Sequence, residues 1–142
     1  MSVFIKEIMS SEVTTIPYDS IVENAECTML TTNRRCVPVI EESGNCVGVL
    51  SHSDILSARS AKIDVSTILV EDIMSKNIMS VSPHCSIGDA MELMIDHGMH
   101  HVLVIMCDKV IGIVSVIDII KASKSRAIDL FSNADSFAVS SH

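Results

Sequence analysis

The sequence lacks the features of a membrane, secreted or nucleic-acid-binding protein. No apolar run approaches the roughly 18 residues of a membrane span, and residues 1–12 lack the charged, apolar and small-residue order of a signal peptide. Its 10 Lys and Arg residues are scattered and outnumbered by 18 Asp and Glu, which gives a net charge of −8. Binding a phosphate backbone requires clustered basic residues. We therefore expect a cytoplasmic protein that contacts neither membrane nor nucleic acid.

Catalytic and disulfide motifs are missing as well. The chain contains no G-x-S-x-G elbow, no G-x-x-x-x-G-K-[ST] loop and no C-x-x-C pair. Its 5 cysteines are odd in number, and several fall on apolar faces, as is typical of reduced thiols that serve as small hydrophobic residues. Only Cys36, beside Arg34 and Arg35, has basic neighbours that would favour a thiolate. We expect no enzymatic activity.

What the sequence does contain is a duplicated unit. The segment Gly48–Asp54 recurs as Gly112–Asp118 at an offset of 112 − 48 = 64 residues, with its glycine, serine and aspartate in register. Further segments recur in the same order: Ile8-Met9-Ser10 as Ile73-Met74-Ser75, and Val37–Ile40 as Val102–Ile105. A repeat held over so many points fixes the architecture as two similar units.

Each copy predicts the same order of elements. In the second copy, Ser86 and Asp89 form a capping-box-like helix start and Gly98 is placed to end the helix. Its expected apolar face is Ile87, Met91, Met94 and Ile95. In the first copy, the corresponding start is Ser20 and Glu23, and the expected face is Ile21, Ala25 and Met29.

A β-hairpin is expected after each helix. The predicted strands are Val37–Ile40 with Cys46–Leu50, and Val102–Met106 with Val110–Val114, the second pair around a turn at residues 107–109. Each hairpin runs into a helix capped by Ser51 or Ser53 in the first copy and by Ser115 in the second. We divide the chain into repeat 1 (1–60), a linker (61–66), repeat 2 (67–124) and a partly disordered tail (125–142) whose apolar residues Ala127, Ile128, Leu130 and Phe131 extend the last helix. A repeat of about 60 residues buries too little surface alone, so the halves should pack together.

These motifs together resemble a tandem pair of CBS domains, named after cystathionine β-synthase. The resemblance rests on the I-M-S entry, the A-x-x-x-M helix, the V-P-V-like strand and the closing G-h-h-S-x-x-D, and it covers residues 1 to about 122. It implies an α/β (α+β) fold of two β-α-β-β-α repeats packed through their sheets. It also implies adenosyl ligands in clefts between the repeats, a homodimer, and regulation of another protein.

The closing motif has chemistry of its own. A carboxylate at the start of a helix offers acceptor oxygens for both hydroxyls of a ribose, and a serine three residues earlier adds a polar contact. By resemblance, Asp54 and Asp118 are the ribose-binding aspartates, with Ser51, Ser53 and Ser115 as hydroxyl partners. The same Ser-x-x-Asp pattern is also an ordinary capping box that binds nothing, and the two roles can coexist.

The resemblance combines the aspartate of one repeat with other segments of the opposite repeat. One site would use Ser51, Ser53 and Asp54 with Ile78, Met79, His100 and His101. The other would use Ser115 and Asp118 with Val13, Arg35, Glu12 and Arg34. Because arginine stays charged while histidine titrates near neutrality, the two sites should differ, and the histidine pair should hold phosphate better as pH falls. Glu12 would repel phosphate if it points inward, so we favour the Asp54 site.

A zinc site at His97, His100 and His101 is a rival interpretation. No cysteine or carboxylate completes an evident ligand set, and Gly98 interrupts the helix between them, so solvent-exposed histidines are favoured. The leading prediction is a regulatory module that senses AMP, ADP, ATP or NAD, requires no obligatory cofactor and acts in trans on an unidentified protein partner. A ligand-free dimerisation or assembly module is the alternative, and a metal-dependent enzyme the third.

Overall fold

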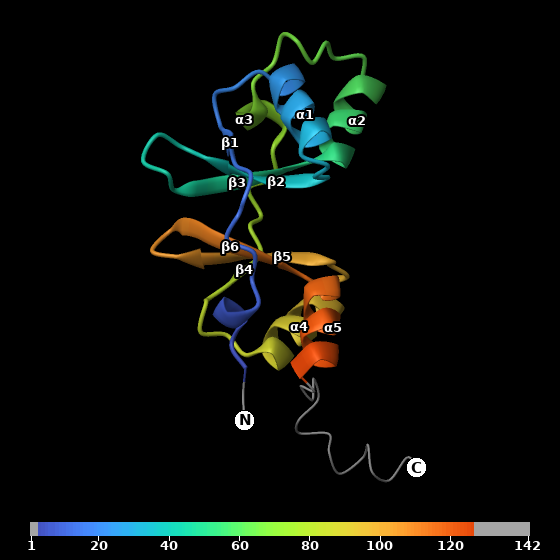
Figure 1. The fold of residues 1–142 in the computed structure, drawn as a ribbon. Coiled ribbons are helices and arrows are strands. Elements are labelled where there is room, and N and C mark those ends of the chain that lie inside the picture. Colours follow the sequence, from blue (N-terminus) through green and yellow to red (C-terminus); the bar gives the residue numbers. More distant parts are fainter. Residues whose placement is uncertain (1–2, 127–142) are drawn as a thin grey trace. The chain divides into compact units, whose positions relative to one another are not determined.

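The computed structural model describes residues 3–126, and its packing divides them into two compact units. We call them the Asp54 unit, residues 12–79 and 107–110, and the Asp118 unit, residues 3–11, 80–106 and 111–126. Each unit contains a mixed three-stranded sheet with helices on one face (Figure 1). The predicted α/β class with two β-α-β-β-α repeats is confirmed.

The Asp54 unit is built around the sheet order β1-β2-β3. Its elements are β1 (Ile16–Pro17), α1 (Val22–Thr31), β2 (Cys36–Ile40), β3 (Cys46–Ser51), α2 (His52–Ser60) and α3 (Val70–Ile73). β1 runs parallel to β2, and β2 pairs antiparallel with β3, so that Cys36 lies opposite Ser51. This register brings the start of β2 to the start of α2.

The Asp118 unit repeats this arrangement with the sheet order β4-β5-β6. Its elements are a short 3₁₀ helix, η1 (Ile5–Glu7), then β4 (Ser80–Val81), α4 (Ile87–His97), β5 (His101–Met106), β6 (Lys109–Ser115) and α5 (Val116–Arg126). The first two residues of β6 and the turn before them, residues 107–110, are grouped with the Asp54 unit. The turn from β5 to β6 contains Cys107 and Asp108, both at positive φ, which is the geometry of a tight two-residue hairpin rather than the expected three-residue turn.

Alternating side chains of the strands and one stripe of each helix form the cores. In the Asp54 unit Val37, Val39 and Leu50 are 0–1% exposed and pack with the stripe Val22, Ala25 and Met29 of α1. In the Asp118 unit Val102, Val104 and Val114 pack with Ile87, Met91 and Met94 of α4. Both stripes follow the helical period, so burial of one face holds each helix on its sheet.

Two details of the predicted helices are wrong. α1 is capped by Ile21, which is 39% exposed, and Val22 takes the inward position. Ser20 instead donates its hydroxyl to the Pro17 carbonyl oxygen at 2.6 Å, so it closes a turn and caps no helix. Ile95 of α4 is 62% exposed and lies outside the core stripe, because Met91 and Met94 already fill that face.

Other helix ends follow the sequence. Ser86 accepts a hydrogen bond from the Asp89 amide at 3.1 Å, and Gly98 ends α4 in the left-handed conformation. α2 extends to Ser60, directly before the expected linker at 61–66. Residues 127–142, which hold the apolar tail residues, lie outside the described residues.

The compact units are offset from the sequence repeats. Residues 3–11, which open repeat 1, pack in the Asp118 unit, where Ile5 donates to the Cys85 carbonyl at 2.8 Å and Ile87 donates to the Val3 carbonyl at 3.1 Å. Residues 67–79, which open repeat 2, pack in the Asp54 unit, where the Val22 amide donates to Ile68 at 3.0 Å. Each repeat therefore contributes its first segment to the other repeat's core, so the packing units are not divided at the expected linker, residues 61–66.

Candidate functional site

The Ser-x-x-Asp motif of the Asp54 unit lies where β3 runs into α2. The Ser51 amide donates to Asp54 Oδ2 at 2.9 Å, and the Asp54 amide donates to Ser51 Oγ at 3.2 Å. Ser53 Oγ lies 2.9 Å from Ser51 Oγ. This is a reciprocal capping box, which settles Ser51 rather than Ser53 as the N-cap and satisfies amides that the helix leaves unpaired.

The second motif has the same geometry between β6 and α5. The Ser115 amide donates to Asp118 Oδ2 at 2.9 Å, and the Asp118 amide donates to Ser115 Oγ at 3.0 Å. Within residues 3–126, the second carboxylate oxygen, Oδ1, has no hydrogen-bond partner in either aspartate. Both aspartates are half-buried. Each cap therefore uses one oxygen of its aspartate and leaves the other available.

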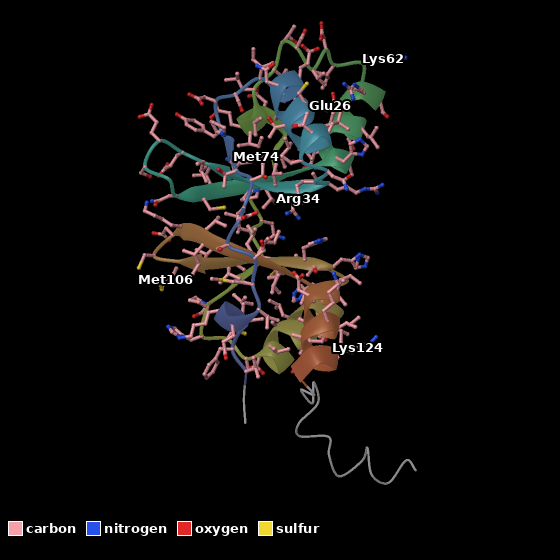
Figure 2. The ribbon with its side chains drawn as sticks, viewed as in Figure 1. Glu26, Arg34, Lys62, Met74, Met106 and Lys124 are labelled. Carbon is pink, nitrogen blue, oxygen red and sulfur yellow. The ribbon has the colours of Figure 1, made fainter. Side chains whose placement is uncertain are left out.

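Backbone contacts bring the residues before β2 and β5 to these motifs. The His52 amide donates to the Arg35 carbonyl at 2.8 Å, and the Val116 amide donates to the His100 carbonyl at 3.0 Å. Arg34 and Arg35 are exposed, and neither guanidinium forms an ion pair with another described residue (Figure 2 labels Arg34). The structure therefore places Arg35 beside the Asp54 motif and His100 beside the Asp118 motif, within one unit each.

Cys36, the first residue of β2, is close to Asp54. Desolvation raises the pKa of the Cys36 thiol, and the Asp54 carboxylate raises it further. Burial likewise raises the pKa of Cys46 and Cys85. The expectation that Arg34 and Arg35 favour a thiolate at Cys36 is wrong, because the pKa of this thiol is raised and not lowered. All 5 cysteines are free and none is fully buried, but Cys85 packs against the core of the Asp118 unit, as expected of a small hydrophobic residue.

The remaining predicted site residues are distributed between the units. Ile78 and Met79 are half-buried in the segment that follows Ser75, in the Asp54 unit. Val13 is half-buried and Glu12 is exposed at the start of the same unit. His100 and His101 are exposed where β5 begins, in the Asp118 unit. The expected combinations of an aspartate from one unit with residues of the other stay predictions.

The three histidines of the rival zinc interpretation sit at the end of α4 and the start of β5. The His97 ring nitrogen Nδ1 lies 3.0 Å from the Leu93 carbonyl oxygen, and all three side chains are exposed. In residues 3–126, no group of three or more His, Cys, Asp or Glu side chains is placed to hold a metal ion. The same part of the chain contains no helix with the length and hydropathy needed to cross a membrane.

Sequence reasoning missed the role of the glycines that open the two motifs. Gly48 and Gly112 each lie in contact with an Ile-Met-Ser segment, and a β-carbon at either position would come within 2.7 Å of a methionine sulfur. The signal was present, because the Ile-Met-Ser segment is duplicated together with the glycine. What the sequence could not show is which copy of the segment meets which glycine.

Comparison with known proteins shows which family this chain matches. The family model described as "CBS domain" matches the chain twice, over residues 5–61 and 70–125. An uncharacterized protein of Methanocaldococcus jannaschii is 32% identical over 100 residues, which are 69% of this chain and 24% of that protein. A second protein of that organism is 23% identical over 82% of this chain and 41% of its own length. The chain thus spans less than half of these two relatives.

Other similar proteins match along most of their length. The CBS domain-containing protein YhcV of Bacillus subtilis is 27% identical over 115 residues, 81% of each chain. The crystal structure of CBSX2 in complex with AMP has a TM-score of 0.77 at 20% identity, covering 88% of this chain and 98% of that one. The CBS domain pair of MJ0100, in complex with 5′-methylthioadenosine and S-adenosyl-L-methionine, has a TM-score of 0.75 at 22% identity, covering 89% and 99%.

Proposed function

The chain belongs to the CBS domain family as a tandem pair of CBS domains, and from this premise we propose that it is a regulatory module that binds an adenosyl ligand. The ligand classes are AMP, ADP, ATP and NAD, with S-adenosylmethionine added because one similar structure carries it. The binding residues we propose are Asp54 and Asp118 for ribose, with Ser51, Ser53 and Ser115 beside them. The module carries out no chemistry on its ligand.

The observation that carries the proposal is the Oδ1 oxygen of each motif aspartate, which has no hydrogen-bond partner among residues 3–126. A carboxylate has about four lone-pair positions, and each cap occupies one oxygen, Oδ2, in both motifs. Asp54 and Asp118 can therefore accept ribose hydroxyls at Oδ1 while they keep the helix start in place. An ordinary cap needs no duplication, but a ligand site in each repeat does, and this favours the binding role over capping alone.

The similar structures support the class of ligand. One is described with AMP and another with two adenosyl sulfur compounds, so an adenosine moiety is what those ligands share. For phosphate we propose Arg35, with Arg34 assisting, and His100 with His101; the apolar Ile78, Met79 and Val13 would contact the purine. Arginine has a fixed charge and a forked donor geometry suited to phosphate, whereas histidine binds it only when protonated.

We test the proposal with a thermal-shift panel of AMP, ADP, ATP, NAD, S-adenosylmethionine and zinc. A ligand that binds only the folded state stabilises it by RT ln(1 + [L]/Kd), about 3 kcal/mol at 100 times Kd. Asp54→Ala and Asp118→Ala should each reduce the shift. The matched control is Asp89→Ala, because Ser86-x-x-Asp89 is a cap of the same sequence pattern in α4 without a proposed ligand role. Equal losses of the shift in all three variants would reject the binding role.

The alternative is an assembly module that binds no nucleotide. Exposed apolar side chains on the helices are consistent with the homodimer that we propose in either case: Leu30 and Leu56 in the Asp54 unit, and Ile95, Ile117 and Ile120 in the Asp118 unit. Light scattering after gel filtration measures the oligomeric state. If the chain is dimeric and no adenosyl compound shifts its melting, the assembly module is the correct reading; a shift with zinc alone would favour the metal-dependent interpretation.

A further inference from the structure

Gly48 and Gly112, the glycines that open the two motifs, each contact a segment from elsewhere in the chain. A β-carbon built on Gly48 would lie 2.7 Å from Met74 Sδ and 2.7 Å from the Ser75 carbonyl oxygen. On Gly112 it would lie 2.5 Å from Met9 Sδ and 3.1 Å from the Ser10 carbonyl oxygen. At Gly48 the added β-carbon would lie closer to the Ser75 backbone than real β-carbons come to any atom. At Gly112 it would displace the Met9 side chain and require the Ser10 backbone to shift by a few tenths of an ångström, so glycine is the residue that fits at both positions. Figure 2 labels Met74 beside β3.

The residue after each glycine is hydrogen-bonded to the same segment in both directions. The Val49 and Ser75 amides each donate to the other's carbonyl at 2.9 Å. Ser10 donates to Ile113 at 2.9 Å, and Ile113 donates to Ser10 at 3.0 Å. β3 and β6 are the last strands of their sheets, so these bridges lie on the outer edge of each sheet. Each bridge lies two residues before the serine that caps α2 or α5.

We propose that each Ile-Met-Ser segment is the positioning element of one Ser-x-x-Asp motif. Residues 73–75 position Ser51 and Asp54, and residues 8–10 position Ser115 and Asp118. A capping box forms only if the end of the strand and the first turn of the helix keep their geometry, and the bridge fixes that strand end from its open side. The segment that opens each sequence repeat thus positions the motif that closes the other repeat.

The positioning of the motifs is a property of the protein without ligand. Its consequence for ligand binding rests on the proposed function. In that case the segment at residues 8–10, although it belongs to repeat 1, controls the Asp118 site and leaves the Asp54 site unaffected.

Amide hydrogen exchange on the full chain without ligand tests the positioning. Gly112→Ala should raise the exchange rates of the Ser10, Ile113 and Asp118 amides by about ten-fold or more, because local opening exposes them. The Val49 and Asp54 amides should keep their rates. Gly48→Ala should give the reverse pattern. A uniform rise in exchange across both units, or no change at the motif amides, would overturn the proposal.

A second pair of variants covers the case in which the glycine variants do not fold. Met9→Ala and Met74→Ala loosen the segments by removing contacts instead of adding a clash. Their matched controls are Met94→Ala and Met29→Ala, core methionines of the same units that do not touch the glycines. The proposal requires selective exchange at the nearer motif in Met9→Ala and Met74→Ala only. Equal selectivity in the controls would show general core loosening and reject it.

Binding of AMP and S-adenosylmethionine distinguishes a failure of the positioning proposal from a failure of the proposed function. If either probe binds the wild type, Met9→Ala should weaken it at least several-fold in the Asp54→Ala background, where only the Asp118 site remains, and should leave it unchanged in the Asp118→Ala background. If neither probe binds the wild type, the proposed function fails while the exchange pattern still decides the positioning. Equal weakening in both backgrounds would contradict the crossed assignment.

Discussion

At the scale of single residues, Asp54 and Asp118 form the helix caps that the sequence predicts and leave room for the ribose contact that we propose. The capping box is present in both motifs, and it leaves one carboxylate oxygen without a partner among residues 3–126. A cap and a ribose contact therefore need not compete. The cap would also prepare the proposed site, since an aspartate already fixed in orientation loses little further entropy when a ligand binds.

Cys36 is a chemical probe of the Asp54 motif. Because desolvation and the Asp54 carboxylate both raise the pKa of this thiol above 9.0, the folded state prefers the protonated form. The contribution of this preference to the free energy of unfolding is fully present below pH 9.0 and is lost as pH rises through the raised pKa. In a variant that keeps Cys36 as its sole cysteine, we expect the midpoint of alkylation rate against pH to lie above 9.0.

The contribution of the carboxylate can be isolated with Asp54→Asn. This variant keeps an oxygen for the Ser51 amide but removes the negative charge, so the midpoint should move down toward 9.0 without returning fully, because desolvation remains. Alkylation by iodoacetamide over a pH series, read by mass spectrometry, provides the measurement. A midpoint below 9.0 in the parent variant would mean that Arg34 and Arg35 control the thiol after all.

At the scale of elements, Gly98 shows what a helix end requires. It ends α4 at φ 62° and ψ 34°, and a β-carbon there would meet no other heavy atom within 4 Å. Gly98→Ala therefore carries backbone strain without a clash, and should lower the free energy of unfolding by about 1 kcal/mol. Gly98→Asn should lose less, because asparagine tolerates the left-handed region. Urea unfolding measures both, and an alanine variant as stable as wild type would refute the argument.

Short-range sequence patterns predicted most helices and strands, but they could not predict contacts between residues far apart in the chain. The hairpins, the Ser51, Ser86 and Ser115 caps and the Gly98 stop depend on residues a few positions apart, so the sequence displays them. The helix start at Ile21 depends on contacts with residues far along the chain, such as the bond from the Val22 amide to the Ile68 carbonyl. For the site, the motifs were visible, but the proximity of Cys36 to Asp54 follows from strand register.

At the scale of the whole molecule, the exchange of segments separates the repeat from the folding unit. The CBS family model matches residues 5–61 and 70–125, whereas the packing groups residues 12–79, with 107–110, in one unit and residues 3–11 with 80–106 and 111–126 in the other. A duplicated chain can thus keep two similar sites while neither copy is self-sufficient. The interdependence also accounts for the presence of an Ile-Met-Ser segment and a motif glycine in each copy.

This separation predicts how fragments of the chain behave. A fragment of residues 12–79 keeps Val65 and Val70 of its core and the bridge between Ser75 and Val49, whereas residues 1–60 lose all of these. Val65 and Val70 are 6% and 0% exposed, and losing a buried valine forfeits about 1.5 kcal/mol or more of burial energy. The fragment 1–60 also keeps Ile5 and Met9, whose packing partners lie in the other unit.

We therefore expect the 12–79 fragment to be the more ordered of the two, with a larger fraction of dispersed amide signals in its NMR spectrum and a sharper urea transition. Since units of about 60 residues are marginal alone, the comparison between fragments matters more than the absolute stability of either. The matched control is 12–79 with Gly48→Ala, which should lose the advantage because residues 73–75 no longer fit on β3. Equal order in 1–60 and 12–79 would show that the sequence repeat is itself the folding unit.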